Sequence, residues 1–106
     1  MKALLSLAAA LLFCGCEAAP YYVPPAPTAE MARRQSDADV DLAVLQKGRV
    51  LFAHRCIQCH TLPAIWYYRA EDWPLIVNSM AHRASLKPAE REAIVAYILA
   101  VRRQNL

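Results

Sequence analysis

Residues 56–60 read Cys-Ile-Gln-Cys-His, and this CxxCH motif constrains the chain more than any other feature of its sequence. Two thiols separated by two residues, in a turn of helix, have the spacing needed to reach the two vinyl groups on one edge of a porphyrin. The imidazole that follows can then bind the iron from one face of the ring. The pattern is typical of c-type haem attachment. We therefore expect haem c as the cofactor, bound covalently by Cys56 and Cys59, with His60 as the proximal iron ligand.

Other interpretations of a CxxC pair agree less well with the chain. A structural zinc site needs four ligands, usually from two such pairs or from one pair and two distant histidines, and the chain has one pair. A thioredoxin-like redox motif is expected in a βαβ setting, and no strand pattern is visible. A plain disulfide between the two cysteines would not explain why a histidine, His60, directly follows the second one.

The N-terminus has the features of an export signal. A positive start is followed by an apolar run over residues 3–13, interrupted only by Ser6. A bilayer core needs about 20 apolar residues to span, so this shorter run suits a signal peptide better than a membrane helix. We therefore expect residues 1–15 to be a signal peptide and the mature chain to lie on the periplasmic side of a bacterial membrane.

The end of this segment, Phe13-Cys14-Gly15-Cys16, resembles a bacterial lipobox. Cys16 is the better acceptor because a small glycine precedes it. Acylation of Cys16 would anchor the protein to the membrane, since such cysteines carry more than one chain and stable anchoring needs two. The alternative is ordinary cleavage after Ala18, which would release a soluble periplasmic protein.

Residues 16–41 are expected to form a proline-rich tether. Four prolines fall within residues 20–27, where they remove backbone donors and favour an extended spacer. Residues 42–106 form the expected folded domain.

This domain resembles a small class I cytochrome c, on more than the CxxCH motif. Gly48-x3-Phe52-x3-Cys56 has the spacing of the N-terminal helix of that family, and residues 93–98 resemble its C-terminal helix. The resemblance implies an all-α domain of three to four helices around covalent haem. It also implies that the terminal helices cross with Gly48 against Tyr97.

Helix signals agree with an all-α fold. The first helix is expected from about Asp41 to Arg55, a second from Glu71 to about His82, and the last from Pro88, since proline suits the first position of a helix. Apolar residues at helical spacing predict the buried faces; these are Leu45, Gly48 and Phe52, and Ile94, Tyr97, Ile98 and Val101.

The distal iron ligand is expected to be Met80, which lies 20 residues beyond His60, where the family places its axial thioether. His82 is the alternative and would give a bis-histidine haem. His54 is a weaker candidate. The resemblance extends to a Leu-Pro pair after the haem motif, with the region of Pro63 supplying a carbonyl to the proximal imidazole.

Side chains of Arg69 or Trp73 could hydrogen-bond a haem propionate. Ligation by histidine and methionine leaves no open coordination position and favours ferrous iron. The expected function is therefore one-electron transfer. Because no catalytic pair of acid and base lies near the motif in the sequence, we do not expect an independent enzyme. Two alternatives stay open: a fixed haem subunit of a membrane or periplasmic oxidoreductase complex, and a haem sensor or ligand-binding protein if Met80 does not bind iron.

Charge points to the kind of redox partner. Residues 42–106 carry nine lysines and arginines against four acids, a balance of +5. This excess favours docking to an acidic protein face by steering that salt weakens. Nucleic acid is not an expected partner for an exported protein.

Overall fold

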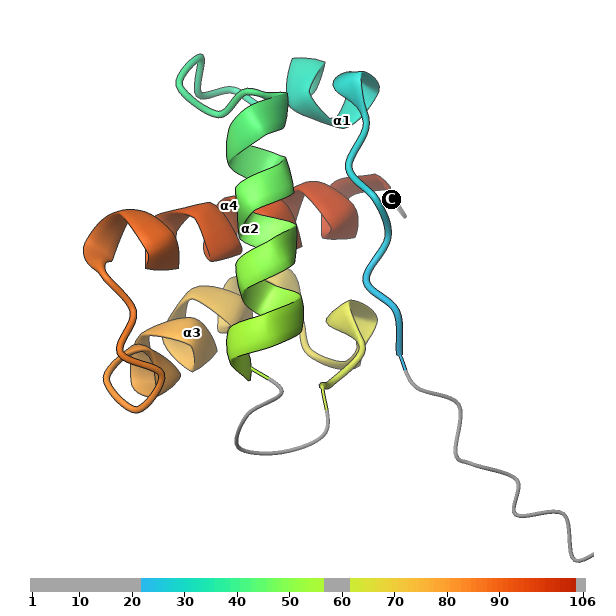
Figure 1. Cartoon of the computed structure of the whole chain (residues 1–106). Helices are drawn as coiled ribbons and strands as arrows, with labels where there is room; N and C mark the ends of the chain where they lie inside the picture. The colour runs from blue at the N-terminus through green and yellow to red at the C-terminus, as the bar shows by residue number, and fades with distance from the viewer. Residues whose placement is uncertain (1–21, 57–61, 105–106) are drawn as a thin grey trace, which may run out of the picture.

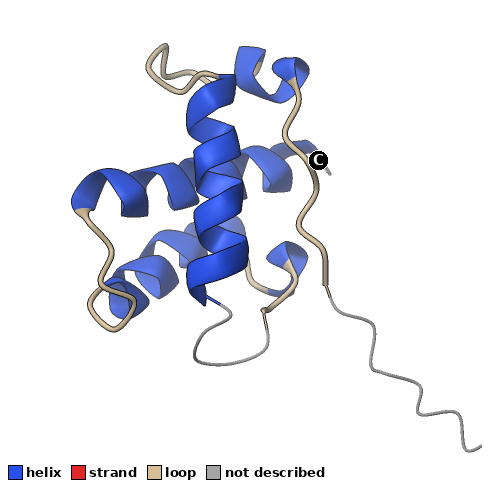
Figure 2. Cartoon of the chain, in the orientation of Figure 1, coloured by secondary structure: helices blue, strands red, loops and turns tan. Residues whose placement is uncertain are grey.

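The computed structural model describes residues 22–56 and 62–104. Within these ranges the chain forms helices joined by loops and turns, without strands (Figure 2). The all-α prediction is therefore confirmed for the described part of the chain. The elements are α1 (Ala29–Arg33), α2 (Leu42–Arg55), the 3₁₀ helices η2 (Ile65–Tyr67) and η3 (Ala70–Asp72), α3 (Trp73–Ala81) and α4 (Pro88–Gln104).

The start of α2 is set by a side-chain cap. Asp41 has extended backbone angles, and its carboxylate accepts a hydrogen bond from the backbone N–H of Val44 at 2.9 Å. Such a cap satisfies one of the N–H groups that have no partner within the helix. Cys56 is the C-cap of the same helix, so the first cysteine of the CxxCH motif is held at the end of a rigid element.

Helices α2 and α4 cross in close contact at Gly48 (Figure 1). A Cβ atom placed on Gly48 would lie 2.0 Å from the carbonyl oxygen of Ala93 and 2.7 Å from the Cβ of Tyr97. Only a residue without a side chain allows this approach of two backbones. The expected contact of Gly48 with Tyr97 is confirmed.

The core lies where α2, α3 and α4 meet. The faces predicted for α2 and α4 are both buried, including Leu45 and Phe52 on one helix and Ile94 and Tyr97 on the other. Trp73 and Val77 of α3 complete this cluster. Burial of apolar side chains is the main stabilising contribution to such a small domain.

The helix expected over residues 71–82 divides into two parts. Residues Ala70–Asp72 form the 3₁₀ turn η3, and the α-helix begins at Trp73 with Pro74 in its first turn. Proline fits there because the first N–H groups of a helix have no internal partner. The helix ends at Ala81, and His82 is its C-cap.

The proline-rich segment differs from the expected spacer. Within residues 16–41, the described part from Tyr22 onward packs against the domain. The Tyr97 hydroxyl donates a hydrogen bond to the carbonyl of Pro25, and the Arg49 guanidinium donates one to the carbonyl of Pro24 at 3.0 Å. Prolines lack a backbone donor but keep a carbonyl acceptor, and both acceptors are used here. The described residues 22–41 of the predicted tether therefore pack against the helices.

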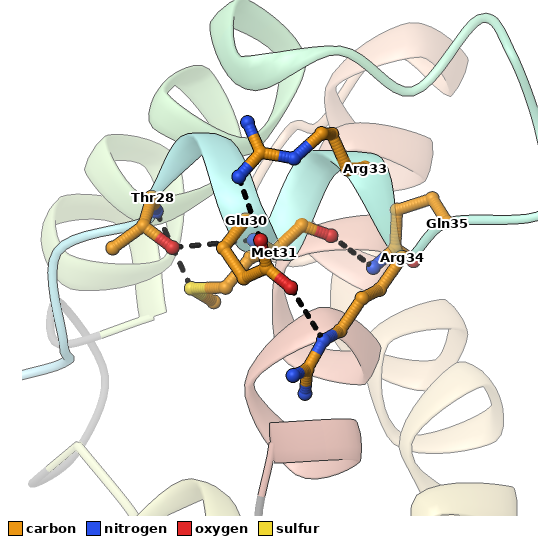
Figure 3. A network of polar contacts seen from close by, with 6 residues as sticks. All are labelled: Thr28, Glu30, Met31, Arg33, Arg34 and Gln35. Atoms are coloured by element: carbon orange, nitrogen blue, oxygen red, sulfur yellow. Dashed lines mark hydrogen bonds and ion pairs between the residues drawn. The ribbon is translucent and has the colours of Figure 1, made fainter.

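Local polar contacts stabilise the short helix α1, which lies within the same proline-rich segment (Figure 3). The Thr28 hydroxyl accepts from the backbone N–H of Met31, and the Thr28 N–H donates to the Met31 sulfur at 3.4 Å. Glu30 pairs with Arg33 and Arg34, and these guanidinium groups lower the pKa of its carboxyl. A helix of five residues is not stable alone. The Met31 side chain stabilises it by packing into the core, where it is 1 % exposed.

No helix in residues 22–56 and 62–104 is long and apolar enough to cross a membrane.

Candidate functional site

A mainly apolar cleft opens between the C-terminal end of α2, α3 and the turn that follows α3. It encloses about 90 Å³ and is partly open to solvent. Ligand and cofactor pockets typically measure roughly 300–1,000 Å³, so the case for a cofactor site comes from the residues of the lining and not from the volume. Its lining residues are Phe52, Arg55, Cys56, Pro63, Trp73, Val77, Met80, Arg83, Ala84 and Leu86.

The cleft brings together two of the residues singled out by the sequence. Cys56 enters its wall from the end of α2, and Met80 enters from the last turn of α3. Both residues are partly buried. The other two expected ligands of the motif, Cys59 and His60, lie outside the described residues, as does Cys16.

The histidine alternatives to Met80 are placed differently. His82 and His54 are both exposed, and neither lines the cleft. His82 does not line the cleft because it follows Met80 by two residues. At 3.6 residues per turn, this spacing places it about 200° further around the helix axis. The arrangement thus favours Met80 as the residue able to meet a ligand in the cleft.

The floor of the cleft is held rigid by aromatic contacts. The Trp73 indole N–H donates to the carbonyl of Ile65 at 2.8 Å, and the Trp73 ring meets Phe52 edge to face with centroids 5.9 Å apart. Trp73 is fully buried. Its polar atom is therefore already satisfied, which fixes the ring as part of the cleft wall.

The two residues expected to reach a propionate have other partners. The Trp73 N–H is used by Ile65, and Arg69 pairs with Asp72 at 3.0 Å and with Glu71 at 3.3 Å. These acids raise the pKa of the Arg69 guanidinium. Neither Arg69 nor Trp73 is arranged to hold a second anion, and that hypothesis gains no support.

The cleft contains two cations that the sequence interpretation did not single out, Arg55 and Arg83. A signal was present in their spacing, since Arg55 directly precedes Cys56 and Arg83 follows Met80 by three residues, close to one helical turn. A charged residue next to a motif is common on any helix, however, and only the shared cleft distinguishes these two.

The lining fits haem by its chemistry. Apolar and aromatic side chains suit the faces of a porphyrin, and two guanidinium groups suit its two carboxylates. A thiol and a thioether are present in the same walls. Within residues 22–56 and 62–104 no three His, Cys, Asp or Glu side chains are grouped to hold a metal ion. Iron bound inside a porphyrin needs no such group, because the ring supplies four of its ligands.

Comparison of the chain with protein-family models, with curated proteins and with solved structures gave no match. The site is therefore interpreted from its own residues.

Proposed function

We propose that the protein transfers single electrons by means of a covalently bound c-type haem. The observation that carries the proposal is the cleft in which Cys56, the first cysteine of the CxxCH motif, and Met80 share one apolar lining. Cys56 and Cys59 would bind the haem, and His60 and Met80 would be its axial ligands. Arg55 and Arg83 would pair with its carboxylates.

Bound haem supplies a reversible one-electron couple between ferric and ferrous iron. The chain's own residues determine what this couple can do. His60 and Met80 would both bind the iron, which would leave no coordination position open and would favour the ferrous state. Phe52, Trp73 and Val77 line the cleft with apolar side chains, which would lower the local dielectric constant around a bound haem. We therefore propose electron transfer to and from other proteins, and no independent enzymatic activity.

Charge supports acidic redox partners. Residues 42–106 carry nine basic side chains against four acidic ones. This net positive charge can steer an acidic protein face towards the domain, with an association rate that falls as salt rises. Location on the periplasmic side of a bacterial membrane, with a lipid on Cys16, stays part of this proposal.

A fixed haem subunit of an oxidoreductase complex is the second candidate. Its support is the exposure of two large side chains, Trp66 at 56 % and Tyr67 at 75 %. Exposed aromatic residues that lie together can mark a permanent interface. A haem sensor is less well supported, because Met80 lines the cleft where a sensor needs an open iron position.

An absorption spectrum of the purified protein tests the proposal. Ferric haem bound by a thioether sulfur has a weak long-wavelength band that bis-histidine haem lacks. We expect this band in the wild type and in the matched control His82→Ala. Met80→Ala should lose the band, bind exogenous ligands such as carbon monoxide in the ferrous state, and have a lower reduction potential.

A wild-type protein without haem contradicts the proposal as a whole. Loss of six-coordination in His82→Ala together with its retention in Met80→Ala would show a bis-histidine haem instead. Carbon monoxide binding by the wild type would favour the sensor.

A further inference from the structure

Two pairs of aromatic rings lie at and around η2 and are here called the aromatic face: Tyr22 with Trp66, and Tyr67 with Tyr68. Trp66, Tyr67 and Tyr68 are exposed, and Tyr22 is half-buried. Tyr22 meets Trp66 edge to face with ring centroids 5.1 Å apart, and Tyr67 meets Tyr68 in the same manner at 4.9 Å. Val23, next to Tyr22 in the chain, is 70 % exposed.

The described chain begins at this face. Tyr22 is the first described residue and packs on Trp66. The residues after it are fastened to the helices through the carbonyls of Pro24 and Pro25 and through buried Met31. The position of Tyr22 is thus set by the fold, and we call it the exit point because it is the first described residue.

Little chain separates this exit from the expected lipid. Five residues, 17–21, lie between Cys16 and Tyr22. Fully extended, the six steps from one Cα to the other cover at most about 22 Å. A long tether would let the domain turn freely above a membrane, whereas this length holds the exit point close to it.

We propose that the aromatic face lies against the membrane surface. The inference rests on the proposed lipid at Cys16. Tryptophan and tyrosine are enriched at membrane–water interfaces, where their apolar rings and polar edges are both accommodated. A short anchored segment brings these rings to the bilayer, and their insertion fixes the orientation of the domain.

This orientation leaves the haem cleft accessible. The turn after α3, which contributes Arg83 and Leu86 to the cleft, lies on the opposite side of the domain from η2 and the N-terminal segment (Figure 1). A membrane at the aromatic face therefore does not cover these residues, and acidic partners can reach this side of the domain from the aqueous phase.

Hydroxyl-radical footprinting tests the orientation. The acylated protein is placed in phospholipid vesicles at low surface density, and oxidation of single residues is measured by mass spectrometry. The reference is an unacylated form that begins at Glu17, in the same buffer without vesicles. We expect oxidation of Trp66 and Tyr67 to fall several-fold on the vesicles. His82, exposed on the turn after α3, should be oxidised equally in both samples.

Equal oxidation of Trp66 and Tyr67 in the two samples would overturn the proposal, because the domain would then stand away from the bilayer. Protection that also covers His82 would overturn it, since it indicates shielding without orientation. Protection that disappears as the surface density is lowered would identify a second copy of the chain as the occupant. The same spectra show the mass at Cys16, and an unmodified cysteine overturns this inference alone, because haem absorption tests electron transfer separately.

Discussion

Substitution of Gly48 by alanine tests the packing on which the whole domain depends. The added Cβ would lie 2.0 Å from the carbonyl oxygen of Ala93, against a normal carbon–oxygen contact of about 3.3 Å. It would also lie 2.7 Å from the Cβ of Tyr97, against about 3.5 Å for two carbon atoms. Helices α2 and α4 must therefore separate by about 1 Å at their crossing.

The cost of this separation can be compared with the gain from removing a glycine. Overpacking of a core typically costs about 1–3 kcal/mol, occasionally more. A gap of about 1 Å also removes up to half of the dispersion energy across the remaining contacts. Alanine gains only about 0.5–1 kcal/mol over glycine inside a helix. We expect a net loss of about 3 kcal/mol, which lowers Tm by roughly 12–24 °C in a domain of this size.

Urea unfolding followed by the helical circular dichroism signal measures this loss. Gln46→Ala, at an exposed position of the same helix, is the matched control and should stay within about 0.5 kcal/mol of wild type. Adding Ala93→Gly should not rescue Gly48→Ala, because the nearest atom is backbone. A Gly48→Ala protein as stable as the control would refute the close crossing of α2 and α4.

Three further predictions follow from the site and from the packed N-terminal segment. Acid–acetone extraction should leave haem on the wild-type protein and remove it from the double variant Cys56→Ala with Cys59→Ala; free extraction from wild type would contradict covalent attachment. Met31→Ala should destabilise the domain by about 2 kcal/mol or more in urea unfolding, since a buried methionine truncated to alanine costs about 2–5 kcal/mol, and an unchanged midpoint would mean that the segment is free in solution. Burial raises the pKa of Tyr97 above its ordinary value of 10.0, so the tyrosine ionises in the unfolded chain before it does so in the folded one, and stability should fall as pH rises above about 10. Tyr97→Phe should lose about 0.5–1.5 kcal/mol at neutral pH, through the hydrogen bond to Pro25, and should show a shallower decline at alkaline pH; parallel pH profiles would exclude Tyr97 as the titrating group.

The helices and their buried faces could be predicted from the sequence because local rules decide them. Asp41 caps α2, Pro88 begins α4, and apolar residues recur at helical spacing on both. The contact of Gly48 with Tyr97 was also predictable, through the resemblance to a family in which these positions meet. Of the predicted site residues, Cys56 and Met80 line one cleft, and their roles in binding haem stay predictions.

Only the tertiary structure decided the rest. Residues 22–41 look like a spacer because their prolines prevent regular hydrogen bonding, yet their carbonyls and the Met31 side chain are bound by groups from α2 and α4 that are distant in the chain. Arg55 and Arg83 share a cleft only because α2 ends beside the end of α3. The rings of Tyr22 and Trp66 are in contact although the two residues are 44 positions apart in the sequence. Local patterns report the conformation of a segment, whereas each of these contacts depends on where two separate segments meet after the helices have packed.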